Sequence, residues 1–237
     1  MRRLPKAILF DLDDMILASG QRPQVLLQIA ESFAAELSPL TPDHVADHLE
    51  AAFTRHWSDP ARHKVARFAL AESRREVVSE AFTALGGPSL EALAAPFADR
   101  FTETREAMTE LFPTARETIE TLKAKGVLLA LVTNGAASVQ RAKIERFALG
   151  DLFHHIQIEG EHGFGKPEER AYLHAMDALE VTPAETWMVG DHLEWEVAAP
   201  QRLGIHAVWY DGFGRGLPPD SEIRPDLTIQ RLAELLA

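Results

Sequence analysis

The second half of the chain alternates between helix-like and strand-like segments, and this alternation constrains the fold more than any other feature. In each helix-like segment apolar residues recur three and four positions apart, and a short apolar run follows. The expected helix and strand pairs are 114–126 with 127–134, 137–150 with 154–160, 167–180 with 186–191, and 194–204 with 205–210. Strands that are separated by helices form parallel sheets with crossover connections. The sequence therefore predicts an α/β fold built on a doubly wound parallel sheet.

One more strand is expected far ahead of this alternation. Residues 7–10, AILF, are wholly apolar, as in a strand that is buried on both faces, and the aspartates Asp11, Asp13 and Asp14 follow almost at once. A last strand at 226–229, followed by a helix, is expected near the end of the chain.

The stretch between the first strand and the alternating half has only helical patterns. The expected helices cover residues 24–37, 41–57, 62–87 and 89–108. We therefore expect two domains. Residues 1–17 and 110–237 form a Rossmann-like core, and residues 18–109 form an inserted helical domain.

Composition excludes several classes of protein. The 237 residues have a formal net charge of −12, so no overall basic surface is available for nucleic acid. No apolar run approaches the roughly 18 residues that a membrane span needs. The absence of cysteine rules out disulfides, thiolate nucleophiles and cysteine-bound zinc. We expect a cytoplasmic protein without a nucleic-acid or membrane partner, and both a monomer and a homodimer remain open.

Polar residues are expected to meet at one edge of the sheet. Asp11 and Asp13 follow the first strand, Thr133 and Asn134 end the second, and Asp191 follows a later one. In an open parallel sheet, ligands bind beyond the carboxyl ends of the strands. Lys166, in a loop just before a helix, can bring a positive charge to the same edge. Carboxylates with a lysine predict a hard cation such as Mg²⁺ and an anionic substrate.

Each of these motifs also has a simpler explanation when it is considered alone. The aspartates suit a turn or a helix cap, about as well as a catalytic cluster. The segment 133–135 is typical of a strand-to-helix turn, and a single Lys166 is usually a solvated side chain. The ordered occurrence of all the motifs favours the functional interpretation.

Four segments, FDLDDM, LVTNG, GKPE and VGDHLEWE, resemble in order the motifs of the haloacid dehalogenase superfamily of phosphohydrolases. The resemblance covers residues 7–17 and 110–210. It implies an Mg²⁺-dependent phosphatase that hydrolyses a small phosphorylated metabolite through an aspartyl-phosphate intermediate. It also implies that residues 18–109 are an α-helical cap.

The same resemblance assigns roles to the matching residues. Asp11 is expected to be the nucleophile and a metal ligand, and Asp13 the general acid and base whose backbone carbonyl joins the metal shell. Thr133, Asn134 and Lys166 are expected to bind the phosphate, with Lys166 also offsetting the charge of Asp11. The resemblance further assigns Asp191 as a direct metal ligand.

Two positions of the catalytic motifs depart from the family pattern. Met15 stands where the family usually has Thr or Val. Glu196 stands where an aspartate would end the last motif, with Trp195 and His192 nearby and Glu194 as a competing carboxylate. We expect Glu196 to act in the outer shell of the metal.

Other activities and the substrate remain open. A 2-haloacid dehalogenase would attack carbon on the same fold, but Asp13 argues against it because a leaving halide needs no acid. A phosphomutase and a non-catalytic binding protein are further alternatives, and the motifs most resemble the nucleotidase and acylneuraminate-phosphate phosphatase branch. Residues 55–75 contain six lysine and arginine residues but only two acidic residues. This stretch is either an anion-attracting surface or, as its charge pattern favours, an ordinary solvated helix face.

Overall fold

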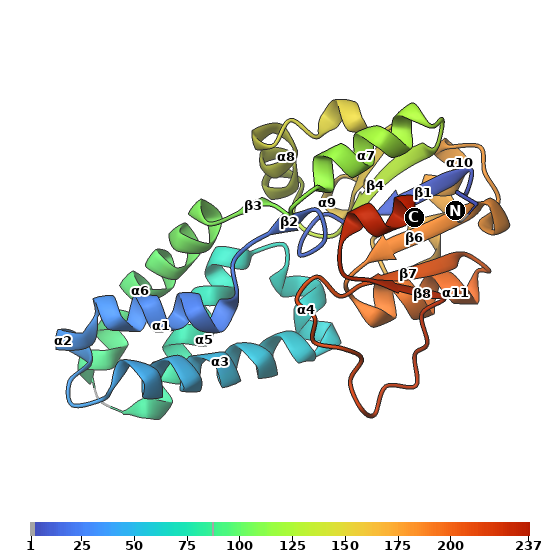
Figure 1. The fold of residues 1–237 in the computed structure, drawn as a ribbon. Coiled ribbons are helices and arrows are strands. Elements are labelled where there is room, and N and C mark those ends of the chain that lie inside the picture. The colour runs from blue at the N-terminus through green and yellow to red at the C-terminus, as the bar shows by residue number, and fades with distance from the viewer. Residues whose placement is uncertain (1–2, 87) are drawn as a thin grey trace. The chain divides into compact units, whose positions relative to one another are not determined.

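The computed structural model describes residues 3–86 and 88–237 and has an α/β fold (Figure 1). In the described part of the chain, six strands form one sheet in the order β5-β4-β1-β6-β7-β8, and every neighbouring pair is parallel. The strands are β1 (Ala7–Phe10), β4 (Leu128–Thr133), β5 (His155–Ile158), β6 (Thr186–Gly190), β7 (His206–Tyr210) and β8 (Leu227–Ile229). The predicted fold class is confirmed.

The central strand β1 is apolar because helices cover both faces of the sheet. Ile8 and Phe10 pack on one face, and Ala7 and Leu9 pack on the other. The first face is covered mainly by α7 (Ala115–Ala124), α8 (Ala137–Arg146) and the 3₁₀ segment Leu232–Leu236, and the second by α10 (Glu169–Ala178) and α11 (Ala199–Arg202). Successive side chains of a strand point to opposite faces, so a strand covered twice has no position for a polar residue.

The chain divides into two compact units. The core unit comprises Met1–Ala18 and Glu110–Ala237, and the helical unit comprises Ser19–Thr109. Where the chain leaves and re-enters the core unit, the short strands β2 (Leu17–Ala18) and β3 (Glu110–Leu111) pair antiparallel. The first boundary therefore falls one residue after the predicted position.

The helical unit has its own apolar core. Its helices are α1 (Arg22–Ser32), α2 (Ala34–Leu37), α3 (Pro42–Ser58), α4 (Pro60–Ala66), α5 (Leu70–Leu85) and α6 (Pro88–Ala107). The Thr41 hydroxyl caps α3 by accepting a hydrogen bond from the His44 backbone N–H at 3.3 Å. Phe53, Phe82 and Phe97 are almost fully buried between these helices.

Four helices differ from their predicted form. The helix expected over 24–37 is interrupted at Phe33, which separates α1 from α2. The helix expected over 62–87 is divided at residues 67–69, where the chain turns, buries Arg67 and leaves Phe68 partly exposed; its predicted end at Gly87 lies outside the described residues. The expected helix 194–204 begins as a π-helical segment, Leu193–Ala198, before α11. The helix expected after β8 is a 3₁₀ segment, because so short a segment gains few α-helical hydrogen bonds.

The remaining short elements are α9 (Glu159–His162) and the 3₁₀ turns Gly150–Leu152 and Pro183–Glu185. Among the described residues, no helix is both long and apolar enough to cross a membrane.

Candidate active site

The predicted site residues lie where three neighbouring strands end. Asp11 follows β1, Thr133 is the last residue of β4, and Asp191 follows β6. The Asp11 backbone N–H donates to the Val189 carbonyl at 3.0 Å, which extends the pairing of β1 with β6 up to the aspartate. The chain leaves β1 for β4 on one side and reaches β6 on the other, so this edge is the point where the strand order reverses. That is where parallel α/β sheets bind ligands.

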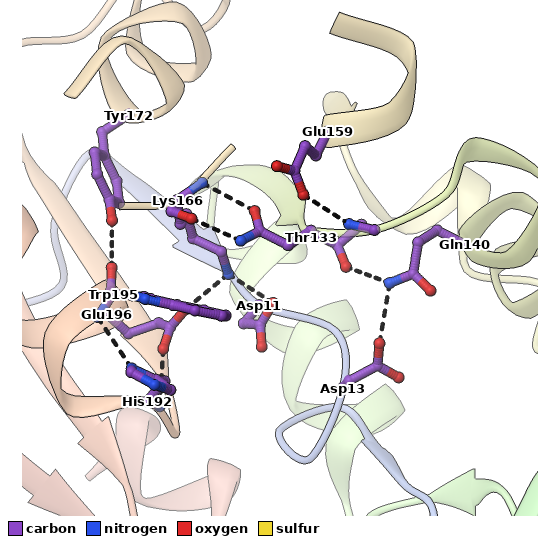
Figure 2. Close-up of polar contacts among 12 residues, drawn as sticks. Asp11, Asp13, Thr133, Gln140, Glu159, Lys166, Tyr172, His192, Trp195 and Glu196 are labelled. Atoms are coloured by element: carbon purple, nitrogen blue, oxygen red, sulfur yellow. Dashed lines mark hydrogen bonds and ion pairs between the residues drawn. The ribbon is translucent and has the colours of Figure 1, made fainter. Parts of the chain in front are cut away.

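Lys166 lies at the centre of the site between two carboxylates (Figure 2). Its side chain is 1% exposed, and Nζ lies 2.6 Å from Asp11 Oδ1 and 2.8 Å from Glu196 Oε1. Burial lowers the pKa of Lys166, but the charges of Asp11 and Glu196 outweigh burial and raise it above its ordinary value. Lys166 therefore stays protonated and binds both carboxylates.

Asn134 holds the backbone of Lys166 in place. Its Nδ2 donates to the Lys166 carbonyl at 2.7 Å, and its Oδ1 accepts from the Lys166 N–H at 2.9 Å. The preceding residue is Gly165, where an added Cβ would lie 2.5 Å from Asn134 Oδ1, so a side chain there would displace this contact. Asn134 is thus used to position Lys166, and its predicted role in binding phosphate stays a prediction.

Glu159 braces the turn that follows β4. It is 3% exposed, and its Oε2 accepts a hydrogen bond from the Gly135 backbone N–H at 3.0 Å. This hydrogen bond fixes the turn just after Thr133. Sequence reasoning missed Glu159 because it was included in an expected strand, although a carboxylate at the end of that strand was a usable signal.

Thr133 and Asp13 are linked through Gln140. Gln140 Nε2 donates to Thr133 Oγ1 at 2.5 Å and to Asp13 Oδ2 at 3.0 Å. The Asp13 carboxylate also accepts from Lys143 Nζ at 2.7 and 2.8 Å. Figure 2 shows the Asp13 side chain directed toward Gln140. Gln140 and Lys143, both on α8, were not predicted as site residues, because nothing in a solvated helix pattern distinguishes them.

Glu196 closes the loop that begins at Asp191. Its Oε2 accepts from the His192 backbone N–H at 2.8 Å, while its Oε1 faces Lys166. The side chain is fully buried and packs on Gly190, where an added Cβ would lie 2.1 Å from Glu196 Cγ. The structure therefore uses Glu196 to hold Lys166, and its predicted outer-shell role toward a metal is not needed to explain its position.

The same loop is held by two aromatic side chains from neighbouring elements. Tyr172 on α10 donates its hydroxyl hydrogen to the Trp195 carbonyl, and Trp209 Nε1 donates to the Asp191 carbonyl at 2.7 Å. Within the loop, the His192 and Trp195 rings stack with centroids 4.2 Å apart.

Met15, the other departure from the motif, is fully buried in the apolar core of the core unit. It is therefore a packing residue.

The site carries more buried negative charge than Lys166 neutralises. Burial raises the pKa of Asp11 to about 6, although Lys166 lowers it. Burial and the charges of Glu196 and Asp11 raise the pKa of Asp191 well above its ordinary value. Burial also raises the pKa of Glu196, against the effect of Lys166. The carboxylates thus favour a further positive charge.

The donor set fits Mg²⁺ if the ion is held by few protein ligands. In residues 3–86 and 88–237, no three Asp, Glu or His side chains form a group that could hold a metal ion by themselves. Mg²⁺ is commonly bound through one or two carboxylates, with water and substrate phosphate completing its shell. Asp11 and Asp191 would provide two oxygen ligands of this kind. The Asp13 carboxylate is engaged by Lys143 and Gln140, so the predicted contribution of Asp13 falls on its backbone carbonyl.

Comparison with known proteins identifies the family. The family model of the haloacid dehalogenase-like hydrolases matches residues 5–204. The chain therefore belongs to this family, and it is a hydrolase.

Two curated relatives are phosphatases. The phosphoserine phosphatase of Thermus thermophilus is 36% identical over 188 residues, which cover 79% of this chain and 72% of that protein. The glyceraldehyde 3-phosphate phosphatase of Pyrococcus furiosus is 33% identical over 139 residues, 58% of this chain and 55% of that protein.

Two solved structures share the fold over nearly the whole chain. A 2-haloacid dehalogenase from Pseudomonas syringae is 26% identical with a TM-score of 0.59, and the match covers 98% of each chain. The putative HAD-hydrolase YfnB from Bacillus subtilis, determined bound to magnesium, is 23% identical with a TM-score of 0.69 over 98% of this chain and 97% of that one.

Proposed function

We propose that this hydrolase is an Mg²⁺-dependent phosphatase that acts on a small phosphomonoester through an aspartyl-phosphate on Asp11. The observation that carries the proposal is the buried pair of Asp11 and Lys166, 2.6 Å apart at the end of the central strand. A carboxylate needs no base to act as a nucleophile, and a fixed ammonium beside it can offset the charge of an approaching phosphoryl group. Relatives named as phosphatases support the same class of substrate.

In the first step, an Asp11 oxygen attacks phosphorus, and the bond between phosphorus and the leaving oxygen breaks. Asp13, once it has left Lys143 and taken up a proton, would give that proton to the leaving alcohol, and in the second step it would take a proton from the water that hydrolyses the aspartyl-phosphate. Mg²⁺, when bound by Asp11, Asp191 and the Asp13 carbonyl, supplies charge that shields the nucleophile from the anionic substrate. Lys166 and the Thr133 hydroxyl bind phosphoryl oxygens.

The contacts of Asp13 set a condition on this mechanism. A proton donor must come within about 3 Å of the leaving oxygen. The Asp13 carboxylate is now held by Lys143 and Gln140, so the leaving oxygen must reach it there or the carboxylate must leave these partners. Thr133 accepts from Gln140 and therefore keeps its own hydroxyl hydrogen free to donate to phosphate.

We further propose that the helical unit is the cap that selects the leaving group, because a separately packed unit inserted between β1 and the rest of the sheet can be varied without changing the site. The relatives' substrates, phosphoserine and glyceraldehyde 3-phosphate, are small phosphorylated metabolites, and we expect the same class here.

The second candidate activity is that of a 2-haloacid dehalogenase, which the P. syringae neighbour favours. In that reaction Asp11 would displace halide from carbon without a metal. Asp13 argues against it. Gln140 links Asp13 to Thr133 and so holds a carboxyl group at the site, whereas displacement of halide needs no general acid. A phosphomutase would keep the aspartyl-phosphate of the proposed mechanism, and a non-catalytic binding protein would not need Asp11 as a nucleophile.

The experiment measures phosphate release from a panel of phosphomonoesters with Mg²⁺ and with a chelator, for the native chain and for Asp11→Asn. We expect turnover that the chelator and Asp11→Asn abolish. The exposed Asp177→Asn is the matched control, and it should retain activity. Halide release from 2-haloacids with no phosphate release would identify the second candidate instead. No activity on the phosphomonoesters or on the 2-haloacids would contradict both candidate activities.

A further inference from the structure

A cavity of about 250 Å³ lies inside the helical unit, between α3, α4 and α5. All of its lining residues belong to this unit, and none has a role in the mechanism above. Its polar and charged lining residues are His48, Arg55, His56, Arg62 and Glu80. The volume is close to the lower end of the range for small-molecule sites, about 300 Å³.

The wall of the cavity contains a buried histidine whose Nε2 makes no hydrogen bond within the described part of the chain. His56 is 7% exposed, and its Nε2 is buried and has no hydrogen-bond partner among residues 3–86 and 88–237. Nε2 of the neighbouring His48 is also buried and has no hydrogen-bond partner in the same described residues. A buried polar atom that lacks a partner is unfavourable, and native proteins usually supply one. A ligand with hydrogen-bond acceptors would provide it for both rings.

The charge of the wall points to an anion. The Arg55 guanidinium has no acidic hydrogen-bond or ion-pair partner among the residues that the structure describes, and Arg62 has only a distant one, Asp59 at 3.9 Å. Among the described residues that line the wall, Glu80 is the only acidic one. A metal ion is a poor fit, because the described part of the chain contains no group of three ligating side chains. Guanidinium groups bind carboxylates with paired hydrogen bonds.

We propose that this cavity binds a small organic carboxylate that carries a hydroxyl or amino group. The carboxylate contacts Arg55 and Arg62, the His48 and His56 rings donate Nε2–H to its oxygens, and the hydroxyl or amino group faces Glu80. This site goes beyond the proposed phosphatase activity and does not depend on it. The basic stretch 55–75 of the sequence thereby gains a specific function for two of its side chains.

The test is isothermal titration of the full chain with L-lactate, L-malate and L-serine, each against sodium chloride of equal ionic strength. At least one probe should bind with one site per chain. Arg55→Gln should weaken that binding tenfold or more, because a charge-assisted contact is lost. Arg100→Gln is the matched control: it removes the same charge from an exposed position of the same unit that does not line the cavity.

A second measurement follows His56 directly. The ¹⁵N resonance of His56 Nε2 should shift when the probe binds, and His56→Phe should weaken binding while leaving the thermal stability of the free protein unchanged or raised, because the unpartnered nitrogen is gone. Asp11→Asn should bind the probe as the native chain does. The proposal is wrong if no probe binds, if Arg55→Gln binds equally well, or if Asp11→Asn abolishes binding, which would place the ligand at the active site.

Discussion

Lys166 gives the site its shape, because one buried ammonium holds two carboxylates that would otherwise repel each other. Asp11 comes from the end of β1 and Glu196 from the segment after β6, so the lysine also ties two neighbouring strand ends together. A buried ion pair contributes little net stability when it is complete, but it is costly to break on one side only.

Replacing this lysine should therefore affect stability and activity separately. We expect Lys166→Met to lower the free energy of unfolding by about 3–5 kcal/mol, since two buried carboxylates lose their partner. Phosphate release should fall by about two to three orders of magnitude. The double variant Lys166→Met/Glu196→Gln should recover part of the stability but none of the activity, as measured by urea unfolding and phosphate release. Equal recovery of both would show that Lys166 has only a structural role.

At the level of single residues, the sequence predicts which side chains reach the site better than what each one touches. The residues that directly follow or end strands, Asp11, Thr133 and Asp191, lie at the predicted edge because strand ends have few possible positions. Glu196 was expected near a metal, yet it contacts Lys166, and Gln140 was not expected at all. Such contacts depend on rotamers and on helix placement, which spacing in the sequence does not encode.

Among the elements of the fold, the loop after β6 depends on one close approach. Gly190 lies against the Glu196 side chain, and the π-helical segment Leu193–Ala198 returns that side chain onto the strand. π-helical turns are rare and occur often at functional sites. Here the turn directs a longer carboxylate than the motif usually has toward Lys166.

An added methyl group at position 190 should move the Glu196 side chain away from Lys166. We expect Gly190→Ala to lower the free energy of unfolding by about 1–3 kcal/mol through overpacking and to reduce phosphatase activity strongly, because Glu196 is displaced from Lys166. Gly150→Ala is the control, since an added Cβ at Gly150 meets no atom of the described residues within 4 Å. Thermal unfolding and phosphate release of the two variants check this, and a Gly190→Ala enzyme with native activity would contradict it.

Helices and strands of regular pattern were predictable, and irregular ones were not. The strands β4, β6 and β7 each lie within an expected segment because a buried parallel strand has a strong apolar signal. The division between α4 and α5 has no such signal, since the apolar spacing continues across it and neither proline nor glycine marks the turn at residues 67–69. Tertiary packing, including the burial of Arg67, decides that turn.

For the whole molecule, the two units have separate apolar cores, so a cavity in one core should loosen that unit more than the other. Phe82→Ala should cost about 3–5 kcal/mol in the helical unit and speed amide hydrogen exchange there about a hundredfold or more. Phe153→Ala, in the core unit, should give the reverse pattern. Hydrogen exchange read by mass spectrometry distinguishes the units, and equal acceleration in both would mean that they unfold as one.

The central place of β1 also governs the order in which the chain can fold during synthesis. Its partners β4 and β6 begin to pair with it at Leu128 and Thr186, more than a hundred residues later in the chain. In the sequence the helical unit lies between β1 and both of these strands, so the ribosome completes that unit while β1 still has no paired strand. Four consecutive apolar residues must then stay unpaired until β4 emerges, which exposes the nascent chain to aggregation. The strand that positions the nucleophile is thus made first and waits for its first partner until β4 is synthesised, and a holding chaperone would act on it in that interval.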